Sequence, residues 1–425
     1  MTDAAAGGWR YGLLGLPLAF AALPLYVQLP AYYAGSFGVP LAALGALLLG
    51  ARLLDALIDP WLGTAVDRLL ARKAAALPMS AAGAAVVLAL GFALLFLPPV
   101  RGTPALLAWA AVALVLSYAA FSALTIAHQA WGAMLGGDEA RRARIVAWRE
   151  GCALAGVLLA SVLPLLAGWT ATAAVLAAAL ALGVWAWNST TAAAPRVHAA
   201  AAQPADRWFP FTQPAFRRLL AVFALNGIAT AVPATLLLFF VQDRLRAPAA
   251  LQPVFLGSYF LCAALSIPLW LRLVPRAGLA RAWLAGMALA LGVFAWAGAL
   301  GDGDALAFAA VCALSGFALG SDLVLPGALL AGVIARAGRR GRGEGVFFGW
   351  WNLVSKLNLA LAAGLALPLL SAAGYTPGDR APHSLQALSI AYCLLPCVLK
   401  LAAAALLYFS MVRTGGVPCA TRDEC

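Results

Sequence analysis

Apolar stretches of about 20 residues recur along this chain, and each is long enough to cross a hydrocarbon layer of roughly 30 Å as a helix. Hydrophobic residues make up 64% of the 425 residues and charged residues 10%. A soluble domain carries about 25% charged residues, so a soluble core could not bury this much apolar surface. The sequence therefore predicts an all-α membrane protein that crosses the bilayer many times.

The apolar stretches predict twelve transmembrane helices in two sets of six. The expected helices lie near 11–34, 41–66, 76–98, 104–135, 145–168, 170–190, 215–241, 251–271, 279–300, 304–335, 345–372 and 384–411. One polar connection, rich in Ala and Pro, divides the two sets. We therefore expect four segments, which are an N-terminal six-helix bundle over 1–190, a cytoplasmic linker over 191–214, a C-terminal bundle over 215–413 and a cytoplasmic tail over 414–425.

The basic residues decide between a nucleic-acid partner and a membrane topology, because the net charge is +12. Most of the 28 Lys and Arg residues fall in loops that would share one side of the membrane if Met1 is cytoplasmic. Short loops rich in Lys and Arg mark the cytoplasmic side. We expect a multi-pass plasma-membrane protein, in a bacterial inner membrane, with both termini cytoplasmic, lipid contacts and no nucleic-acid partner.

The expected helix 41–66 carries two acidic residues, Asp55 and Asp59, which are four apart and share one face. An ionisable side chain at the bilayer centre costs roughly 2.5 to 3.5 kcal/mol, so each requires a partner, a cavity or a function. Two carboxylates in low dielectric cannot both stay ionised without a cation, a proton or a basic neighbour. They predict a coupling site for Na⁺ or H⁺, in which both would be metal ligands if the ion is sodium. A structural ion pair with Arg52 and Lys356 is the alternative.

Lys356 lies inside the expected helix 345–372 among polar neighbours. A buried lysine needs an anion, and the acids of the second helix are available. We expect Lys356 to compete with the coupling ion for Asp55 and Asp59. A lysine whose amine reaches the membrane surface is the alternative.

Other polar groups inside helices are candidates for a substrate cavity. Arg149, which is beside Glu150, and Asp322 could line such a cavity, with an interfacial position or a local ion pair as the alternative. Polar and aromatic groups also follow one another in the fourth helix, with hydrogen-bonded packing as the alternative for its histidine. These residues are Thr125, His128, Gln129 and Trp131.

A charge cluster ends the second helix, where Asp67 and Arg68 follow Gly63. We interpret it as a gate or hinge between helices, to which Arg52 also contributes. The chain contains no nucleotide-binding Gly-Lys-Ser/Thr loop, no helical pair of metal-binding histidines and no soluble catalytic domain. We therefore expect a protein that is not an enzyme, with no cofactor other than the coupling ion.

The second-helix string Asp55-x3-Asp59-Pro60-x2-Gly63-x3-Asp67-Arg68 resembles the signature of the glycoside-pentoside-hexuronide:cation symporters, the melibiose permease branch of the major facilitators. Further matching segments are Tyr11-Gly12, Trp131-Gly132-Ala133, Arg141 to Arg149, and Lys356 through Gly374-Tyr375-Thr376-Pro377. The resemblance implies a monomer with the major facilitator fold and alternating access.

The resemblance also implies roles for single residues. It makes Asp55 and Asp59 cation ligands and Thr125 their helper. It places Arg149 near the sugar and Lys356 near the cation site.

Departures from the family pattern concern the substrate. Ala19 and His128 stand where the sugar symporters place aspartates, and Ile58 replaces an expected Asn. The acidic cluster after the tenth helix is also replaced, by the segment from Ala331 to Arg336. Loss of two carboxylates removes hydrogen-bond acceptors for a glycoside, and loss of the Asn leaves sodium and proton coupling both open.

Three hypotheses follow. The leading one is a secondary active transporter that couples symport of a small organic solute, sugar-like or other, to a cation or proton. The second is a carrier or flippase of a lysolipid or another amphipathic molecule. The third, of another class, is a non-transporting membrane scaffold or receptor.

Overall fold

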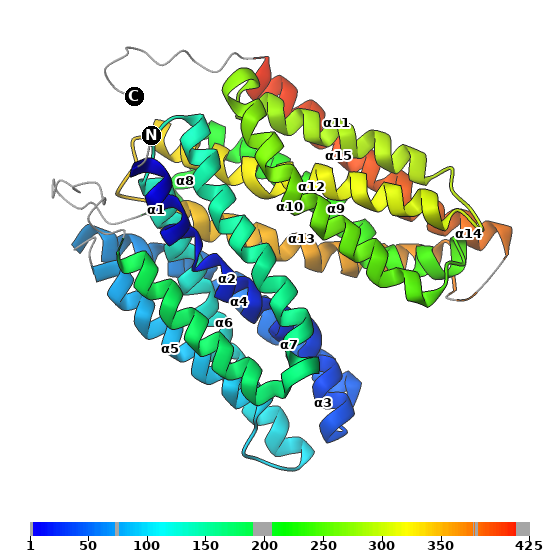
Figure 1. Ribbon diagram of the computed structural model, residues 1–425, viewed down its shortest axis with the longest axis horizontal. Helices are drawn as coiled ribbons and strands as arrows, with labels where there is room; N and C mark the ends of the chain where they lie inside the picture. The colour runs from blue at the N-terminus through cyan, green and yellow to red at the C-terminus, as the bar shows by residue number, and fades with distance from the viewer. Residues whose placement is uncertain (1–2, 73–75, 190–205, 377, 379–380, 414–425) are drawn as a thin grey trace. The chain divides into compact units, whose positions relative to one another are not determined.

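The computed structural model describes residues 3–72, 76–189, 206–376, 378 and 381–413, and the regular elements in these ranges are all helical (Figure 1). In the first part of the chain they are α1 (Asp3–Gly12), α2 (Gly15–Leu23), α3 (Leu29–Phe37), α4 (Leu41–Arg72), α5 (Ala76–Phe96), α6 (Thr103–Met134) and α7 (Glu139–Asn188). The later elements are α8 (Phe209–Thr212), α9 (Pro214–Phe239), α10 (Gln252–Ala277), α11 (Leu279–Ala297), α12 (Ala305–Arg336), α13 (Glu344–Ala372), α14 (Pro382–Ser389) and α15 (Leu395–Leu407).

Ten helical runs in the described ranges are long and apolar enough to cross a membrane. One of them, α7, consists of two helices, because Gly168 has φ 74° and ψ 175°, a backbone conformation that is open to glycine and costly for other residues. The 29-residue α13, which carries Lys356, adds a further helix. Together these account for the twelve helices that the sequence predicts, and the predicted break near residue 168 is confirmed.

The first predicted helix is less regular than expected. It consists of α1, α2 and α3, with a wide π-helical turn over Pro24–Gln28 between the last two. Proline lacks a backbone donor and crowds the preceding turn, and Pro17, Pro24 and Pro30 all lie in this run. Single π-helical turns inside helices are frequent at functional sites.

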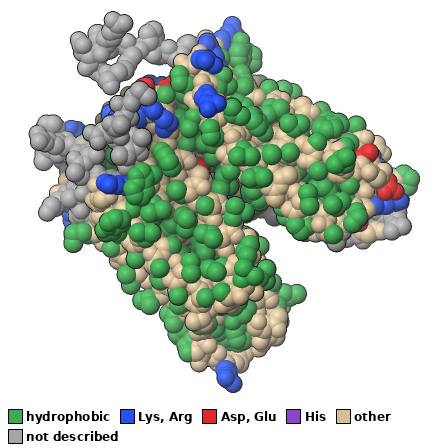
Figure 2. All heavy atoms as spheres, viewed as in Figure 1, with side chains coloured by type: hydrophobic (Ala, Val, Ile, Leu, Met, Phe, Trp, Pro, Cys, Tyr) green, Lys and Arg blue, Asp and Glu red, His purple; other side chains and the backbone are tan. Residues whose placement is uncertain are grey.

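Large apolar side chains cover the outer surface of the long helices. Leu57 and Trp61 are each 57% exposed, Leu165 is 85% and Leu306 is 87% exposed. Figure 2 shows hydrophobic side chains spread along the helices on one face, with Lys, Arg, Asp and Glu mostly near their ends. Such a surface suits lipid and not water. The chain is a multi-pass membrane protein.

Two compact units make up the chain. The N-terminal unit comprises Met1–Gly136, Arg144–Thr212 and Ile334–Leu353. The C-terminal unit comprises Gly137–Ala143, Gln213–Val333 and Val354–Cys425. Each unit therefore contains a short segment from the other half of the sequence. The predicted tail and most of the predicted linker lie outside the described residues.

The segment Ile334–Leu353, which belongs to the N-terminal unit, packs closely on α4 and α6. A side chain at Gly63 would collide with the backbone of Gly345, so α4 and the start of α13 touch through two glycines. The Arg340 guanidinium donates to the carbonyl of Met134, at the end of α6, at 3.3 Å. These contacts hold the start of α13, and the residues just before it, against α4 and α6.

The C-terminal unit includes the short segment Gly137–Ala143 from the first half of the sequence, and it has an aromatic core. The Glu139 carboxylate accepts a hydrogen bond from the backbone N–H of Leu279 at 2.8 Å, which caps α11. In the core, Phe240 stacks on Tyr392 at 4.1 Å between ring centres. Phe308 meets Phe255 edge to face at 5.1 Å.

Candidate functional site

Asp55 is a buried acid of the N-terminal unit that contacts side chains from two other segments. It is 2% exposed on α4, and the Ser122 hydroxyl of α6 donates to its Oδ1 at 2.6 Å. The Tyr26 hydroxyl donates to its other oxygen at 3.2 Å. Hydrogen bonds to an ionised acceptor are roughly twice as strong as neutral ones. Both oxygens of Asp55 thus accept a hydrogen bond from a hydroxyl group outside α4.

The π-helical turn Pro24–Gln28 supplies Tyr26 to this site. The Arg52 guanidinium donates to the backbone carbonyl of Tyr26 and lies 5.1 Å from the centre of its ring. Tyr118 stacks on the same ring at 5.1 Å. Arg52 therefore supports the residue that contacts Asp55, and its predicted gating role stays a prediction.

Asp59 lies one turn beyond Asp55 and is fully buried. The following residue, Pro60, interrupts the backbone bonding of α4, and the Thr64 hydroxyl donates to the Pro60 carbonyl at 2.9 Å. Gly349 of α13 packs directly on the backbone of Asp59, where a side chain would collide. The two acids thus occupy one buried face of α4, beside the start of α13.

The expected helper, Thr125, does not hydrogen-bond to Asp55. Its Oγ1 is buried without a partner among the described residues. Ser122, three residues earlier on α6, makes the contact instead. A cation at Asp55 would therefore meet carboxylate and hydroxyl oxygens, which are the ligand type that hard cations prefer.

Groups of three or more His, Cys, Asp and Glu that could hold a metal are absent from the described ranges. Any sodium site at the two acids would therefore combine carboxylates with hydroxyl or carbonyl oxygens. The same acids could instead carry a proton. The oxygen atoms around the two acids are therefore suited to either Na⁺ or H⁺.

His128 and Trp131 lie in the packed interior of the N-terminal unit. His128 is fully buried, and its Nε2 lies 2.7 Å from the carbonyl of Tyr11. The Tyr11 hydroxyl donates to the carbonyl of His128 at 3.0 Å. Trp131 meets Trp187 edge to face at 6.0 Å. The contacts described here are those of helix packing, and a substrate role for either residue stays a prediction.

Two other predicted substrate residues have polar partners. Gln129 accepts a hydrogen bond from the Asn352 amide at 2.7 Å, which ties α6 to α13. Arg149 donates to its neighbour Glu150 through Nε at 2.9 Å, and its side chain is 14% exposed. The local ion pair that was the alternative for Arg149 is therefore present.

Asp67 caps α13. Its two oxygens accept hydrogen bonds from the backbone N–H groups of Gly345 at 2.7 Å and Val346 at 2.9 Å. A carboxylate at a helix N-terminus satisfies unpaired donors and opposes the positive end of the helix dipole. Arg68 is exposed. The predicted gate thus includes a specific bond between α4 and α13, while gating itself stays a prediction.

Lys356 lies near the middle of α13, in the part of this helix that belongs to the C-terminal unit, and is half-buried. Its competition with the coupling ion stays a prediction.

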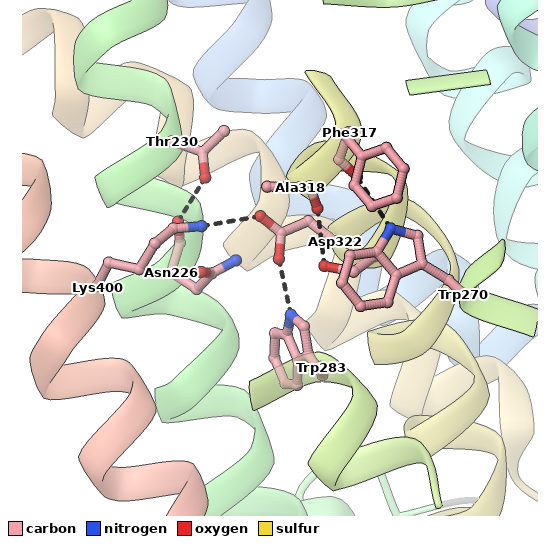
Figure 3. Close-up of polar contacts among 9 residues, drawn as sticks. Asn226, Thr230, Trp270, Trp283, Phe317, Ala318, Asp322 and Lys400 are labelled. Atoms are coloured by element: carbon pink, nitrogen blue, oxygen red, sulfur yellow. Dashed lines mark hydrogen bonds and ion pairs between the residues drawn. The ribbon is translucent and has the colours of Figure 1, made fainter. Parts of the chain in front are cut away.

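Asp322 lies in the C-terminal unit, where it pairs with a lysine that the prediction left out. The Lys400 ammonium of α15 donates to Asp322 Oδ2 at 3.0 Å, and the Trp283 indole donates to Oδ1 at 2.7 Å (Figure 3). The side chains of Lys400 and Asp322 are 8% and 11% exposed.

Sequence reasoning missed Tyr26, Ser122, Lys400 and Trp283 as site residues. The prolines that flank Tyr26 were a usable signal, since they disturb the helix at its position. Ser122 shares a helix face with Thr125, so the spacing alone allowed either hydroxyl to contact Asp55. Lys400 lies within the apolar stretch near 384–411, but its pairing with Asp322 depends on the fold.

Comparison with known proteins supports a transporter. The family model described as MFS/sugar transport protein matches residues 9–413. The inner membrane symporter YicJ of Escherichia coli strain K12 is 28% identical over 156 residues. That match covers 37% of this chain and 33% of YicJ, so the aligned region spans about a third of the relative.

Two solved structures share the fold. A bacterial homologue of the iron transporter ferroportin, in an outward-facing state with soaked iron, matches with a TM-score of 0.70 and 16% identity, over 96% of this chain and 99% of that chain. The fucose:proton symporter FucP of E. coli matches with a TM-score of 0.66 and 14% identity, over 96% and 98% of the two chains. Identities this low show the fold alone, which is that of the major facilitators. The resemblance drawn from the motif on α4 is confirmed at the level of the family, and this chain belongs to the MFS/sugar transport protein family.

Proposed function

We propose that this chain is a secondary active transporter that couples symport of a small organic solute to Na⁺ or H⁺ at Asp55 and Asp59. The observation that carries the proposal is the buried pair of acids on one face of α4. Asp55 accepts hydrogen bonds from two hydroxyls. Buried acids on a membrane helix are costly, and coupling to an ion gives them a function.

The coupling ion would bind at the face of α4 where the two carboxylates lie one turn apart. Asp55 accepts hydrogen bonds from Ser122 and Tyr26, and two ionised carboxylates at this spacing would carry an electrostatic cost. A bound sodium ion or a proton on Asp59 relieves that cost. The site thereby links solute movement to the cation gradient.

The orientation and the membrane belong to the same proposal. Loops rich in Lys and Arg support a cytoplasmic location for both termini. The printed name of YicJ, an inner membrane symporter, supports a bacterial inner membrane. The working form is a monomer surrounded by lipid, and its solute is sugar-like or another small organic molecule.

Transport in proteoliposomes tests the proposal. A panel of sugars, other solutes and lysolipids is offered under an imposed sodium or proton gradient. We expect one solute class to accumulate with wild-type protein, and we expect no accumulation with Asp59→Asn or Asp55→Asn. The control is Asp302→Asn, which changes an acid in an exposed loop pair.

Each other outcome contradicts the proposal in a definite way. Accumulation that persists in both variants would remove the acids from coupling. Movement of lysolipids alone, without dependence on a gradient, would favour the lipid carrier. Saturable binding without any movement would favour the scaffold or receptor.

A further inference from the structure

The C-terminal unit contains a cavity of about 160 Å³ that involves none of the acids on α4. Its walls come from α9, α10, α11, α12 and the segment 390–400. They include the rings of Phe255, Tyr259, Phe294 and Tyr392. Asp322 and Lys400 also line it, so a mostly apolar cavity includes a buried ion pair, which is drawn in Figure 3.

The ion pair at this end has unused hydrogen-bonding capacity. An ammonium group has three donors and a carboxylate can accept about four bonds. In the described ranges, Lys400 donates to Asp322 alone, and each oxygen of Asp322 accepts one bond. A buried ion pair offsets its desolvation only when its remaining donors and acceptors are satisfied. A ligand that both donates and accepts would complete this pair.

A second polar point lies farther along the same wall. Ser315 lines the cavity, and its buried Oγ has no partner among the described residues. Ser315 and Asp322 are seven residues apart on α12, which is about two turns, or roughly 10 Å along the axis. The cavity thus offers a polar group at two places with apolar and aromatic walls between them.

Charge and volume restrict the ligand. The Asp322–Lys400 pair has no net formal charge, so an ionic ligand would add an uncompensated charge in low dielectric, which is costly. A hydroxyl donates to a carboxylate and accepts from an ammonium, which suits both partners. Cavities of about 150 Å³ lined by apolar residues accommodate benzene, so this one fits a single six-membered ring.

We propose that this cavity binds a small uncharged cyclic alcohol, with one hydroxyl at the Asp322–Lys400 pair and, in a diol, a second hydroxyl near Ser315. The site lies within one unit and does not use Asp55 or Asp59. It therefore goes beyond the proposed symport, and binding there does not depend on coupling.

Equilibrium dialysis of purified protein in detergent tests the proposal, with radiolabelled trans-1,4-cyclohexanediol as probe and protein-free micelles as the blank. We expect saturable binding that unlabelled cyclohexanol displaces. Methylcyclohexane lacks the hydroxyl and cyclohexanecarboxylate carries a charge, so each should displace the probe at least about tenfold less well. Because the assay uses no gradient, its outcome is separate from that of the transport test.

Paired variants locate the binding. Asp322→Asn combined with Lys400→Met removes both charges together, and we expect at least about tenfold weaker binding of the diol. The matched control is Arg246→Gln combined with Asp302→Asn, which removes an exposed ion pair of the same unit. That control should bind the diol like the wild type.

Ser315→Ala provides a test that does not depend on folding of the double variant. It should weaken binding of the diol about threefold to tenfold and leave cyclohexanol unchanged, since only the diol reaches the second point. The proposal is wrong if the diol does not bind saturably, or if the charged and apolar analogues compete equally well. Equal binding of the diol by wild type, the double variant and Ser315→Ala would also overturn it.

Discussion

The two units of this transporter place charge inside the membrane in different ways. In the N-terminal unit, Asp55 and Asp59 share one face of α4, and hydroxyl groups donate to Asp55. In the C-terminal unit, Asp322 meets a lysine at 3.0 Å and an indole N–H at 2.7 Å. The first arrangement concentrates carboxylates, whereas the second pairs one acid with one base.

This difference indicates different ligands for the two sites. A face with two carboxylates attracts a cation or a proton, because either one lowers the repulsion between them. A neutral pair has no such preference and favours an uncharged group that can both donate and accept. The comparison therefore agrees with the two proposals, which place ion coupling in the N-terminal unit and binding of a neutral molecule in the C-terminal unit.

The largest expected effect comes from removing one charge of the neutral pair. Asp322→Asn leaves the Lys400 ammonium buried without its carboxylate, and we expect a loss of about 3–5 kcal/mol in the free energy of unfolding. Adding Lys400→Met should recover most of this loss. Denaturant unfolding of purified protein in detergent measures both values. Equal stability of the single and double variants would show that the loss does not come from leaving the Lys400 ammonium unpaired.

A smaller effect should follow from Gly63→Ala in the N-terminal unit. The added methyl group would collide with the backbone of Gly345, and overpacking of this kind costs about 1–3 kcal/mol. Gly45→Ala, on the same helix, is the matched control, because the added methyl group would point into open space. Thermal unfolding should separate the two variants. If they unfold alike, the close contact between α4 and α13 is not needed for stability.

Ser122→Ala and Thr125→Ala compare the hydroxyl that contacts Asp55 with the one that the family pattern favours. Loss of a hydrogen bond to a charged group costs about 1.5–3 kcal/mol, so Ser122→Ala should lower the initial uptake rate at least about tenfold at a limiting cation concentration. Thr125→Ala should stay within about twofold of the wild type. The reverse order would restore Thr125 as the helper.

The smallest effect concerns the longer hydrogen bond to Asp55. Tyr26→Phe removes a 3.2 Å bond, and we expect uptake under the same conditions to fall about threefold to fivefold. Tyr32→Phe is the control, since that hydroxyl donates to the carbonyl of Phe96. A loss in the control as large as in Tyr26→Phe would assign the effect to helix packing.

The helices were predictable because the bilayer allows few alternatives. Backbone groups in lipid must bond within their own helix, so an apolar stretch of sufficient length has one stable form. The break at Gly168 followed from the spacing of two such stretches. The π-helical turn at Pro24–Gln28 did not, since three prolines indicate disturbance but not the kind of turn.

The acids of the candidate site were predictable and most of their partners were not. Asp55 and Asp59 are conspicuous because charge is rare in an apolar helix. Ser122 and Tyr26 resemble many polar residues of membrane helices, and only their approach to Asp55 distinguishes them. The partner of Asp322 could not be inferred, because Lys400 is 78 residues away and pairing depends on helix packing.

The exchange of short segments between the units affects the order of assembly. The N-terminal unit includes Ile334–Leu353, whose Gly345 and Val346 bond to Asp67. A ribosome must therefore synthesise most of the chain before this unit acquires its last piece. A gene split within the linker would produce two incomplete products, each without a segment supplied by the other. Completion of the N-terminal unit is thus a late event in biogenesis, although its helices are made first.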